Sequence, residues 1–335
     1  MPIIDPMHES GQGSPLAGLV PLKTGSPLAV PALFAGCEHA GMRFIEFFTA
    51  NIRNPNTRRA YYNAACRFAR WCDARGLDDL RRVQPVHVAA YVEEMLRSQS
   101  RPSVKQHLAA IRMLMDWLVV GQVIPGNPAA AVRGPRHQVK KGKTPVLSAE
   151  EARTLLDSIE TASVAGQRDR ALIALMTYTF ARVGAAVGMR VEDYYVQGRR
   201  AWVRLHEKGG KRIEIPAHHN LADYLEQYIA MAGIGEDRKS PLFRGARGRK
   251  GELGRAPLGQ SDVYRMIRRR AKIAGIATEL GCHTFRATGI TAYLKNGGRL
   301  EIAQQMAGHE SARTTGLYDR RGDEIALDEV ERIII

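Results

Sequence analysis

The spacing of apolar residues changes along this chain, and that change restricts the folds it can adopt. Between about residues 41 and 130, apolar side chains recur every three or four positions, as in Tyr61, Ala64 and Phe68. This period is typical of amphipathic α-helices that bury one face. The first third of the chain is therefore predicted to form a small all-helical domain.

Polar residues and prolines indicate where these helices begin. Asn56 and Thr57 precede an apolar pattern that starts at Arg58. Pro85 stands where the first turn of a helix tolerates proline. Ser103 is predicted to cap a further helix, because its hydroxyl would accept a hydrogen bond from a free backbone N–H at the helix start.

One stretch in the second half of the chain has a period of two instead. Residues 201–206 and 212–215 alternate between apolar and polar side chains around Gly209 and Gly210, which predicts an antiparallel hairpin. Ser148 opens a capping box well ahead of it. Helical patterns follow at about 219–232, 260–274, 284–295, 299–307 and 325–332. We therefore expect a mainly α protein whose second domain is mixed α+β with a small antiparallel sheet.

Two segments divide the chain into domains. Six prolines fall within the first 33 residues, so residues 1–36 are predicted to be a disordered tail without a signal peptide or a membrane segment. Residues 135–146 are predicted to be a basic linker, because lysines and arginines gather there without an acid. The two folded domains are then 37–134 and 147–335.

A strong positive charge indicates a polyanionic partner. The net charge is +15 at pH 7 and the pI is about 9.9. Ten of these net charges fall within residues 238–273, in a segment from Arg244 to Arg255 that we expect to be a flexible loop and in a helical pattern after it. A solvated face would normally mix both signs, so nucleic acid is the favoured partner.

Several common cofactor sites are not supported by the sequence. Gly142, Lys143 and Thr144 imitate the end of a phosphate-binding loop, but His137 stands where that motif requires glycine. The cysteines show no C-x-x-C pair and no zinc spacing, so we expect reduced thiols, a cytoplasmic location and no cofactor. These cysteines are Cys37, Cys66, Cys72 and Cys282.

Six residues of the second domain suit metal-free cleavage of a phosphodiester. Two guanidinium groups can hold a phosphate, two imidazoles and an ammonium can move protons, and a phenol can attack phosphorus. The set is Arg182, Lys208, His283, Arg286, His309 and Tyr318. The lysine, at the tip of the predicted hairpin, would protonate the departing 5′-oxygen, with Lys211 as the alternative. No nearby His, Cys or Asp completes a ligand set for the histidines, so no metal is expected.

The order of these residues resembles the tyrosine recombinase (phage integrase) family across residues 41–335. The matching segments are 179–184 for its first arginine box, 207–212 for its lysine hairpin, and 283–286, 307–309 and Tyr318 for its second box. The helical first domain resembles the family's SAM-like core-binding domain, which forms a clamp around DNA together with the catalytic domain. The resemblance implies a site-specific recombinase or integrase of a mobile element or replicon, acting through a 3′-phosphotyrosine intermediate without metal or ATP.

Two positions depart from the family pattern. The family usually has an acid three residues after the first arginine, where this chain has Ala185, and often a histidine after the second, where it has Ala287. Glu192 or Asp193 is then expected to orient Arg182. Two alternatives stay open: a catalytically weak or silent DNA-binding protein of the same fold, and a type IB topoisomerase-like enzyme that nicks and closes DNA.

Double-stranded DNA is the expected partner, bound by a homo-oligomer that the resemblance implies to be a tetramer. Exposed basic residues in the first domain, the linker and the 260–274 helix are expected to contact its phosphates. They are Arg58, Arg59, Arg101, Lys105, Lys140, Lys141, Arg265, Arg268 and Arg269. Residues 325–335, which end in three isoleucines, are expected to dock on a neighbouring protomer, with folding back on their own domain as the alternative.

Overall fold

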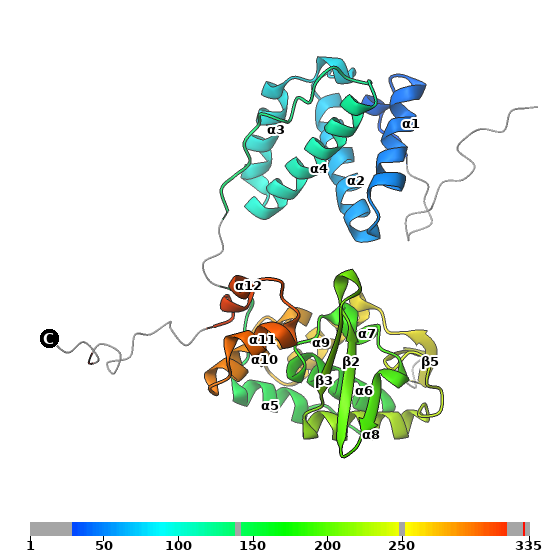
Figure 1. Cartoon of the computed structure of the whole chain (residues 1–335), viewed down its shortest axis with the longest axis vertical. Helices are drawn as coiled ribbons and strands as arrows, with labels where there is room; N and C mark the ends of the chain where they lie inside the picture. Colours follow the sequence, from blue (N-terminus) through cyan, green and yellow to red (C-terminus); the bar gives the residue numbers. More distant parts are fainter. Residues whose placement is uncertain (1–28, 138–141, 248–251, 320–330, 332–335) are drawn as a thin grey trace, which may run out of the picture. The chain divides into compact units, whose positions relative to one another are not determined.

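The computed structural model describes residues 29–137, 142–247, 252–319 and 331 (Figure 1). The chain divides into two compact units, one up to residue 138 and one from residue 139. Most of the predicted N-terminal tail, both Lys140 and Lys141, and all of the predicted C-terminal docking segment except Glu331 lie outside the described residues. Among the described residues, no helix is both long and apolar enough to cross a membrane.

Four α-helices build the described part of the first unit. They are α1 (Glu38–Glu46), α2 (Pro55–Asp73), α3 (Pro85–Ser98) and α4 (Arg101–Val120), with short helical turns at Ala32–Phe34, Phe47–Asn51 and Leu80–Arg82. Aromatic rings fill the core between them: the Phe44 ring lies 4.7 Å from that of Phe34 and 5.0 Å from that of Phe48, centroid to centroid. The predicted all-helical first domain is confirmed.

The starts of these helices differ in part from the sequence prediction. α2 begins three residues before Arg58, because the Asn54 side chain accepts backbone N–H groups of the first turn. α4 is capped by Ser100, whose hydroxyl accepts the backbone N–H of Ser103, so Ser103 lies inside the helix rather than at its cap. α3 begins at Pro85, as predicted.

The predicted disordered tail is wrong for the residues just before α1. Leu33 and Phe34 lie in a short 3-10 turn and are buried in the core of the first unit. Proline content suggested disorder here, but each of these two apolar side chains gains about 1.5–3 kcal/mol when fully buried. That gain offsets the entropy lost when the turn is ordered.

The second unit carries eight α-helices and five strands among its described residues. The helices are α5 (Ala149–Asp157), α6 (Val164–Tyr178), α7 (Val183–Val187), α8 (His219–Ala232), α9 (Gln260–Ile273), α10 (Cys282–Lys295), α11 (Leu300–Ala307) and α12 (Ala312–Gly316). The strands are β1 (Tyr194–Gln197), β2 (Arg200–His206), β3 (Arg212–Pro216), β4 (Arg244–Arg247) and β5 (Glu252–Pro257). The helices predicted at 219–232, 260–274, 284–295 and 299–307 are confirmed to within two residues, and the Ser148 capping box is present.

Three of the strands form a small antiparallel sheet in the order β1-β2-β3. Val203 pairs with Ile215 and Leu205 with Ile213, which places the buried side chains of β2 on one face. The predicted hairpin is therefore confirmed, and β1 extends it. A short turn over Lys208–Gly210 closes the hairpin, and both glycines there have φ near +80°, a conformation that favours glycine.

The basic segment from Arg244 to Arg255 is not a simple loop, contrary to the sequence prediction. Its described residues form a second hairpin, in which β4 pairs antiparallel with β5 and Ala246 lies opposite Leu253. Phe243 is fully buried just before β4 and stacks parallel to Tyr228 of α8. The base of this hairpin is therefore fixed to the core, which charge content alone could not indicate.

α6 lies at the centre of the second unit. Ten of its fifteen residues are buried, on every side of the helix, and it packs against α5, α7, α8 and α10. A helix that is buried all round belongs to a core rather than a surface. The C-terminal end of α6 leads directly into the turn that carries Arg182, so the core fixes where that side chain starts.

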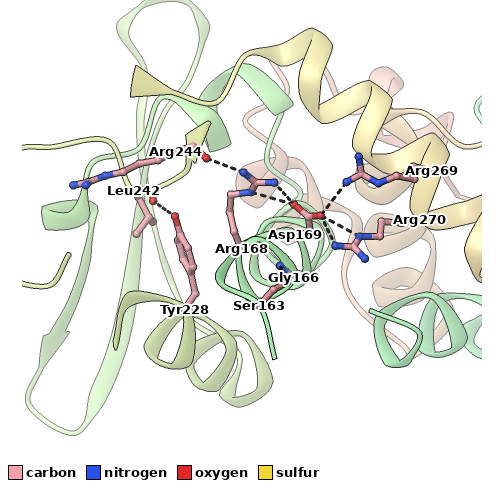
Figure 2. Close-up of polar contacts among 9 residues, drawn as sticks. All are labelled: Ser163, Gly166, Arg168, Asp169, Tyr228, Leu242, Arg244, Arg269 and Arg270. Carbon is pink, nitrogen blue, oxygen red and sulfur yellow. Dashed lines mark hydrogen bonds and ion pairs between the residues drawn. The ribbon is translucent and has the colours of Figure 1, made fainter. Parts of the chain in front are cut away.

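A buried charge cluster joins α6 to the basic helix α9 (Figure 2). The fully buried Asp169 carboxylate lies 2.7 Å from Arg168 Nη2 and 2.8 Å from Arg270 Nη2. The more exposed Arg269 approaches the same carboxylate at 3.6 Å. Arg168 also donates to the carbonyl oxygen of Arg244, so this Asp169 cluster ties α6 to both α9 and the start of β4.

Candidate active site

Five of the six predicted catalytic residues have described side chains, and the structure brings these five together in the second unit. Arg182 and Arg286 lie close enough to each other and to both histidines to lower the pKa of each imidazole. Burial and Arg182 lower the pKa of the Arg286 guanidinium, and Tyr318 lies close enough to offset part of that lowering. These residues come from four separate stretches of the chain, as the predicted set requires.

The turn between α6 and α7 positions Arg182 at the start of α7. Within this turn, Phe180 has φ +55°, a left-handed conformation that costs a non-glycine residue about 1–2 kcal/mol. The Phe180 ring is buried beside Gly289, where a Cβ would lie only 2.8 Å from it. The strained turn directs the Phe180 carbonyl oxygen at Arg286, which donates to it from Nη1. Backbone strain here serves to orient a functional side chain.

Arg286 is the most deeply buried of the five predicted catalytic residues whose side chains are described. Its residue is 2% exposed, and its guanidinium also donates from Nη2 to the carbonyl oxygen of Ala307 at 2.6 Å. Burial first, and then the neighbouring Arg182, lower its pKa to about 10. The group therefore stays charged at neutral pH. Since both hydrogen-bond acceptors are uncharged carbonyls, the positive charge remains available to an anionic substrate.

Glu207 pairs with Arg182, in the place expected for Glu192 or Asp193. Arg182 Nη1 lies 2.6 Å from Glu207 Oε2, and the backbone N–H of Arg182 donates to Oε1 at 3.4 Å. Asp193 instead accepts the backbone N–H of Arg190, and Glu192 lies 3.6 Å from the Arg190 guanidinium. The expectation was therefore wrong: closeness in sequence favoured these two acids, whereas the hairpin delivers Glu207.

Both histidines present neutral imidazoles to the site. His283 is an exposed residue in the first turn of α10, and partial desolvation by the surrounding protein, followed by the charges of Arg286 and Arg182, lowers the pKa of its imidazole. His309 follows Gly308, which ends α11 with φ +59°, at the end of the helix predicted over 299–307. Burial and the same arginines lower the pKa of His309 to about 4, and its Nδ1 lies 2.9 Å from the Thr315 hydroxyl. A neutral imidazole in this place can accept a proton.

Tyr318 stands directly beyond α12 and is half-buried against His309. The two rings are nearly parallel, with an interplanar angle of 5° and centroids 5.9 Å apart. The Thr291 hydroxyl of α10 donates to the Tyr318 carbonyl oxygen at 3.0 Å. The Tyr318 backbone N–H donates to the carbonyl oxygen of Thr315. The α12 segment thus holds the phenol beside a proton acceptor and near Arg286.

The lysine hairpin supplies two candidates for the proton donor. The backbone of Lys208 lies in the turn between β2 and β3, as predicted. The Lys211 side chain lies beside His309: both residues line the same groove of about 870 Å³, and the ammonium helps to lower the pKa of that imidazole. Lys211, the alternative in the sequence prediction, is therefore close to the site.

The depressed pKa of His309 has a measurable consequence. In NMR titrations, the His309 imidazole should stay neutral from pH 8 down to about pH 5 and protonate only near pH 4, whereas an unperturbed histidine titrates near 6.5. The unfolded chain then binds this proton more readily than the folded chain, so stability should fall as pH drops from about 6.5 towards 4. The His309→Gln variant assigns the resonance. A midpoint near 6.5 would contradict the burial of this ring.

Comparison with known proteins finds matches to both units of the chain. The sequence profile of the phage integrase family matches residues 145–324, and that of the phage integrase N-terminal SAM-like domain matches residues 43–121. The chain belongs to the phage integrase family of tyrosine recombinases. The family membership that the sequence motifs predicted is thus confirmed. The members of this family are DNA strand-transfer enzymes, and the five predicted catalytic residues with described side chains all lie within the matched residues 145–324.

Curated relatives and solved structures agree with this assignment. Tyrosine recombinase XerD of Corynebacterium glutamicum is 27% identical over 274 residues, which are 78% of this chain and 86% of the relative. Tyrosine recombinase XerD of Mycobacterium leprae is 28% identical over 282 residues, with the same two shares. A XerH site-specific recombinase in a post-cleavage complex with palindromic difH substrate has a TM-score of 0.68 at 19% identity, over 89% of this chain and 85% of that chain. A lambda integrase dimer bound to a COC′ core site has a TM-score of 0.64 at 21% identity, over 85% of this chain and 96% of that chain.

The predicted DNA contacts fall into two groups. Arg59, Arg101 and Lys105 are exposed on the first unit. The others that are described have partners within the protein. The Arg58 guanidinium donates to the Ile52 carbonyl oxygen, Arg265 pairs with Asp262, Arg268 with Glu279, and Arg269 approaches Asp169. Arg270 belongs to the Asp169 cluster, so the α9 arginines do not act as one uniform basic surface.

Three features of the site escaped the sequence prediction. Glu207 holds Arg182, Thr315 holds His309, and Phe180 turns its carbonyl towards Arg286. Glu207 had one usable signal, since it directly precedes Lys208 and the chain has no acid at Ala185. Thr315 and Phe180 had none, because a threonine and a phenylalanine are ordinary at a helix end and in a core.

Proposed function

We propose that the protein is a site-specific DNA recombinase that cleaves and rejoins double-stranded DNA through a 3′-phosphotyrosine intermediate, without metal or ATP. The observation that carries this proposal is the placement of Tyr318 beside His309 and near Arg286, with Arg182 within electrostatic reach. Among the described residues, no group of three or more His, Cys, Asp or Glu is placed to bind a metal ion. The charge for phosphate binding would come from the two guanidinium groups.

Each residue has a distinct role in the proposed reaction. Arg182 and Arg286 hold the non-bridging oxygens of the scissile phosphate and stabilise the charge that builds up as phosphorus becomes five-coordinate; one such donor contributes about 3 kcal/mol. Tyr318 Oη attacks phosphorus, and its proton passes to His309 or His283. The bond to the 5′-oxygen breaks, and a lysine of the hairpin protonates that oxygen. The 5′-hydroxyl of another strand then reverses these steps and releases the tyrosine.

Partners and cellular setting follow from the same proposal. Double-stranded DNA is the substrate, with Arg59, Arg101, Lys105, Arg265, Arg268 and Arg269 as proposed phosphate contacts; Lys140 and Lys141 of the linker belong to the same proposal. A homotetramer on DNA is supported by the similarity to a lambda integrase tetramer bound to a Holliday junction, with a TM-score of 0.64 at 20% identity. The four free cysteines suit a reducing compartment such as the cytoplasm. The DNA that the protein is proposed to recombine belongs to a mobile element or a replicon.

One experiment separates this proposal from its alternatives. A half-site sequence is first selected by binding the protein to a pool of random duplexes and sequencing those that it retains. A duplex with this half-site is then made with a nick near the scissile phosphate, so that the cleaved state is trapped. The protein is incubated with this DNA, denatured and examined for a covalent adduct. An adduct excludes a catalytically silent DNA-binding protein. Exchange of strands between two differently labelled duplexes excludes an enzyme that only nicks and closes.

The lysine that protonates the leaving group can be identified by changing the leaving group. Replacing the bridging 5′-oxygen of the scissile phosphate with sulfur produces a thiolate, which departs without a proton because its pKa is near 8.5. We expect Lys208→Ala to slow adduct formation on ordinary DNA by about 100-fold or more and to lose most of that defect on the sulfur substrate. Lys211→Ala is the matched variant. If the sulfur substrate instead restores the rate of adduct formation of Lys211→Ala and not that of Lys208→Ala, the proton donor is Lys211.

A further inference from the structure

We infer that Glu207 is the positioning carboxylate of this active site, which fixes Arg182 and the lysine turn together and replaces the acid that the chain lacks at residue 185. The inference rests on the proposed DNA cleavage and assigns one further residue to it. Glu207 does not touch the substrate in this scheme. It acts through the guanidinium that does.

The local geometry explains why a distant acid is needed. Arg182 is the N-cap of α7, and Ala185 is its third helical residue. An acidic side chain at that third position would reach back to the backbone N–H of the N-cap residue. Ala185 is buried and has no polar group. Glu207 Oε1 accepts that N–H at 3.4 Å instead, so a carboxylate from the hairpin occupies the place of the missing one.

The ion pair orients the guanidinium on one side only. Glu207 Oε2 lies 2.6 Å from Arg182 Nη1; the glutamate side chain is 3% exposed and the arginine side chain 35% exposed. A buried carboxylate is costly unless it is paired, so Glu207 strongly favours the position that Arg182 occupies. With Nη1 engaged, Nη2 and Nε of Arg182 remain as donors for a phosphate.

The same residue forms the base of the lysine turn. The Glu207 backbone N–H donates to the Lys211 carbonyl oxygen at 2.7 Å, which closes the turn over residues 208–210. The Glu207 charge also offsets part of the lowering of the Arg286 pKa that burial and Arg182 cause, so it acts on both arginines of the site. One residue, through its side chain and its backbone, therefore links the phosphate-binding arginines to the segment that carries both candidate proton donors.

The first test is Glu207→Gln, which keeps the size of the side chain and removes its charge. We expect adduct formation on nicked half-site DNA to slow by about 100-fold, since a displacement of about 1 Å at a reacting centre has that effect. Half-site affinity should stay within about threefold, because most phosphate contacts lie elsewhere. Glu192→Gln is the matched control and should react like the wild type, since Glu192 lies beside Arg190 outside the site.

Two further measurements distinguish a positioning role from a merely structural one. A methylphosphonate at the scissile position lacks the anionic oxygen that the arginines hold, so the defect of Glu207→Gln should shrink to a few-fold on this substrate. Adding Ala185→Asp to Glu207→Gln should restore at least about tenfold of the lost rate, because it returns a carboxylate to the start of α7. If Glu207→Gln does not fold, Glu207→Asp is measured on the same two substrates, since it keeps the negative charge and only shortens the side chain.

The outcomes separate this inference from the proposed function. A wild-type protein that forms no adduct on half-site DNA would overturn the cleavage chemistry itself. A wild-type protein that forms the adduct, together with a Glu207→Gln variant of equal rate, would overturn the role of Glu207 alone. A defect of the same size on phosphate and methylphosphonate DNA would also overturn it, because Glu207 would then act on folding and not through Arg182.

Discussion

Replacing Tyr318 with phenylalanine is expected to abolish the covalent DNA adduct while half-site affinity changes by only a few-fold. The change removes the only atom of Tyr318 that can bond to phosphorus, so the loss should reach the detection limit. The ring can still stack on His309, and the backbone bonds to Thr291 and Thr315 do not involve the hydroxyl. Losing one hydrogen bond of the hydroxyl typically costs about 1 kcal/mol, which corresponds to an affinity change of about fivefold.

The measurement is a denaturing gel of protein incubated with nicked half-site DNA, combined with a binding titration at fixed salt. Tyr264→Phe is the matched control, because it removes a hydroxyl from an exposed tyrosine of α9 in the same unit. It should form the adduct at the wild-type rate. An adduct that persists in Tyr318→Phe would assign the nucleophile to another tyrosine, with Tyr293 of α10 and Tyr264 as the next candidates.

The sequence predicted the parts of this protein that depend on local patterns. The period of apolar residues indicated the helices, and alternation around Gly209 and Gly210 indicated the β2–β3 hairpin. The spacing between His283 and Arg286 also indicates that both side chains lie on the same side of a helix, because residues three apart on a helix share a face. The family resemblance then supplied the order of the motifs.

Interactions between distant segments were not accessible in the same way. Glu207 and Arg182 are 25 residues apart, and their pairing depends on how the hairpin packs against α7. The acids Glu192 and Asp193 were better candidates by sequence distance. Glu192 instead lies beside the Arg190 guanidinium, and Asp193 accepts the Arg190 backbone N–H and lies near Arg204. Errors at Leu33 and Phe34 have a related cause: composition averages over a segment, whereas burial is decided residue by residue.

Asp169→Asn is expected to be the most destabilising single substitution considered for this protein, at about 3–5 kcal/mol. The carboxylate is fully buried between the guanidinium groups of Arg168 and Arg270, whose side chains are 5% and 13% exposed. Removing the negative charge leaves two positive charges that have little access to water (Figure 2). This cluster was not predicted from the sequence, because Arg265, Arg268 and Arg269 of the same helix were all assigned to DNA contacts.

Urea unfolding followed by tryptophan fluorescence can measure this loss in the second unit alone. Trp202 of β2 is the one tryptophan of that unit, so a Trp71→Phe, Trp117→Phe background makes the signal specific. Asp262→Asn breaks an exposed pair with Arg265 and should cost less than about 1 kcal/mol.

The decisive comparison adds Arg270→Met to Asp169→Asn. If the cost of Asp169→Asn comes from an unpaired buried charge, removing one of the two cations should recover part of the lost stability. If the cost comes only from lost packing, the second substitution should add to the first. An Asp169→Asn variant that loses under about 1 kcal/mol would show that α9 is held by its apolar face, through Val263, Met266 and Ile267, and not by the charge cluster.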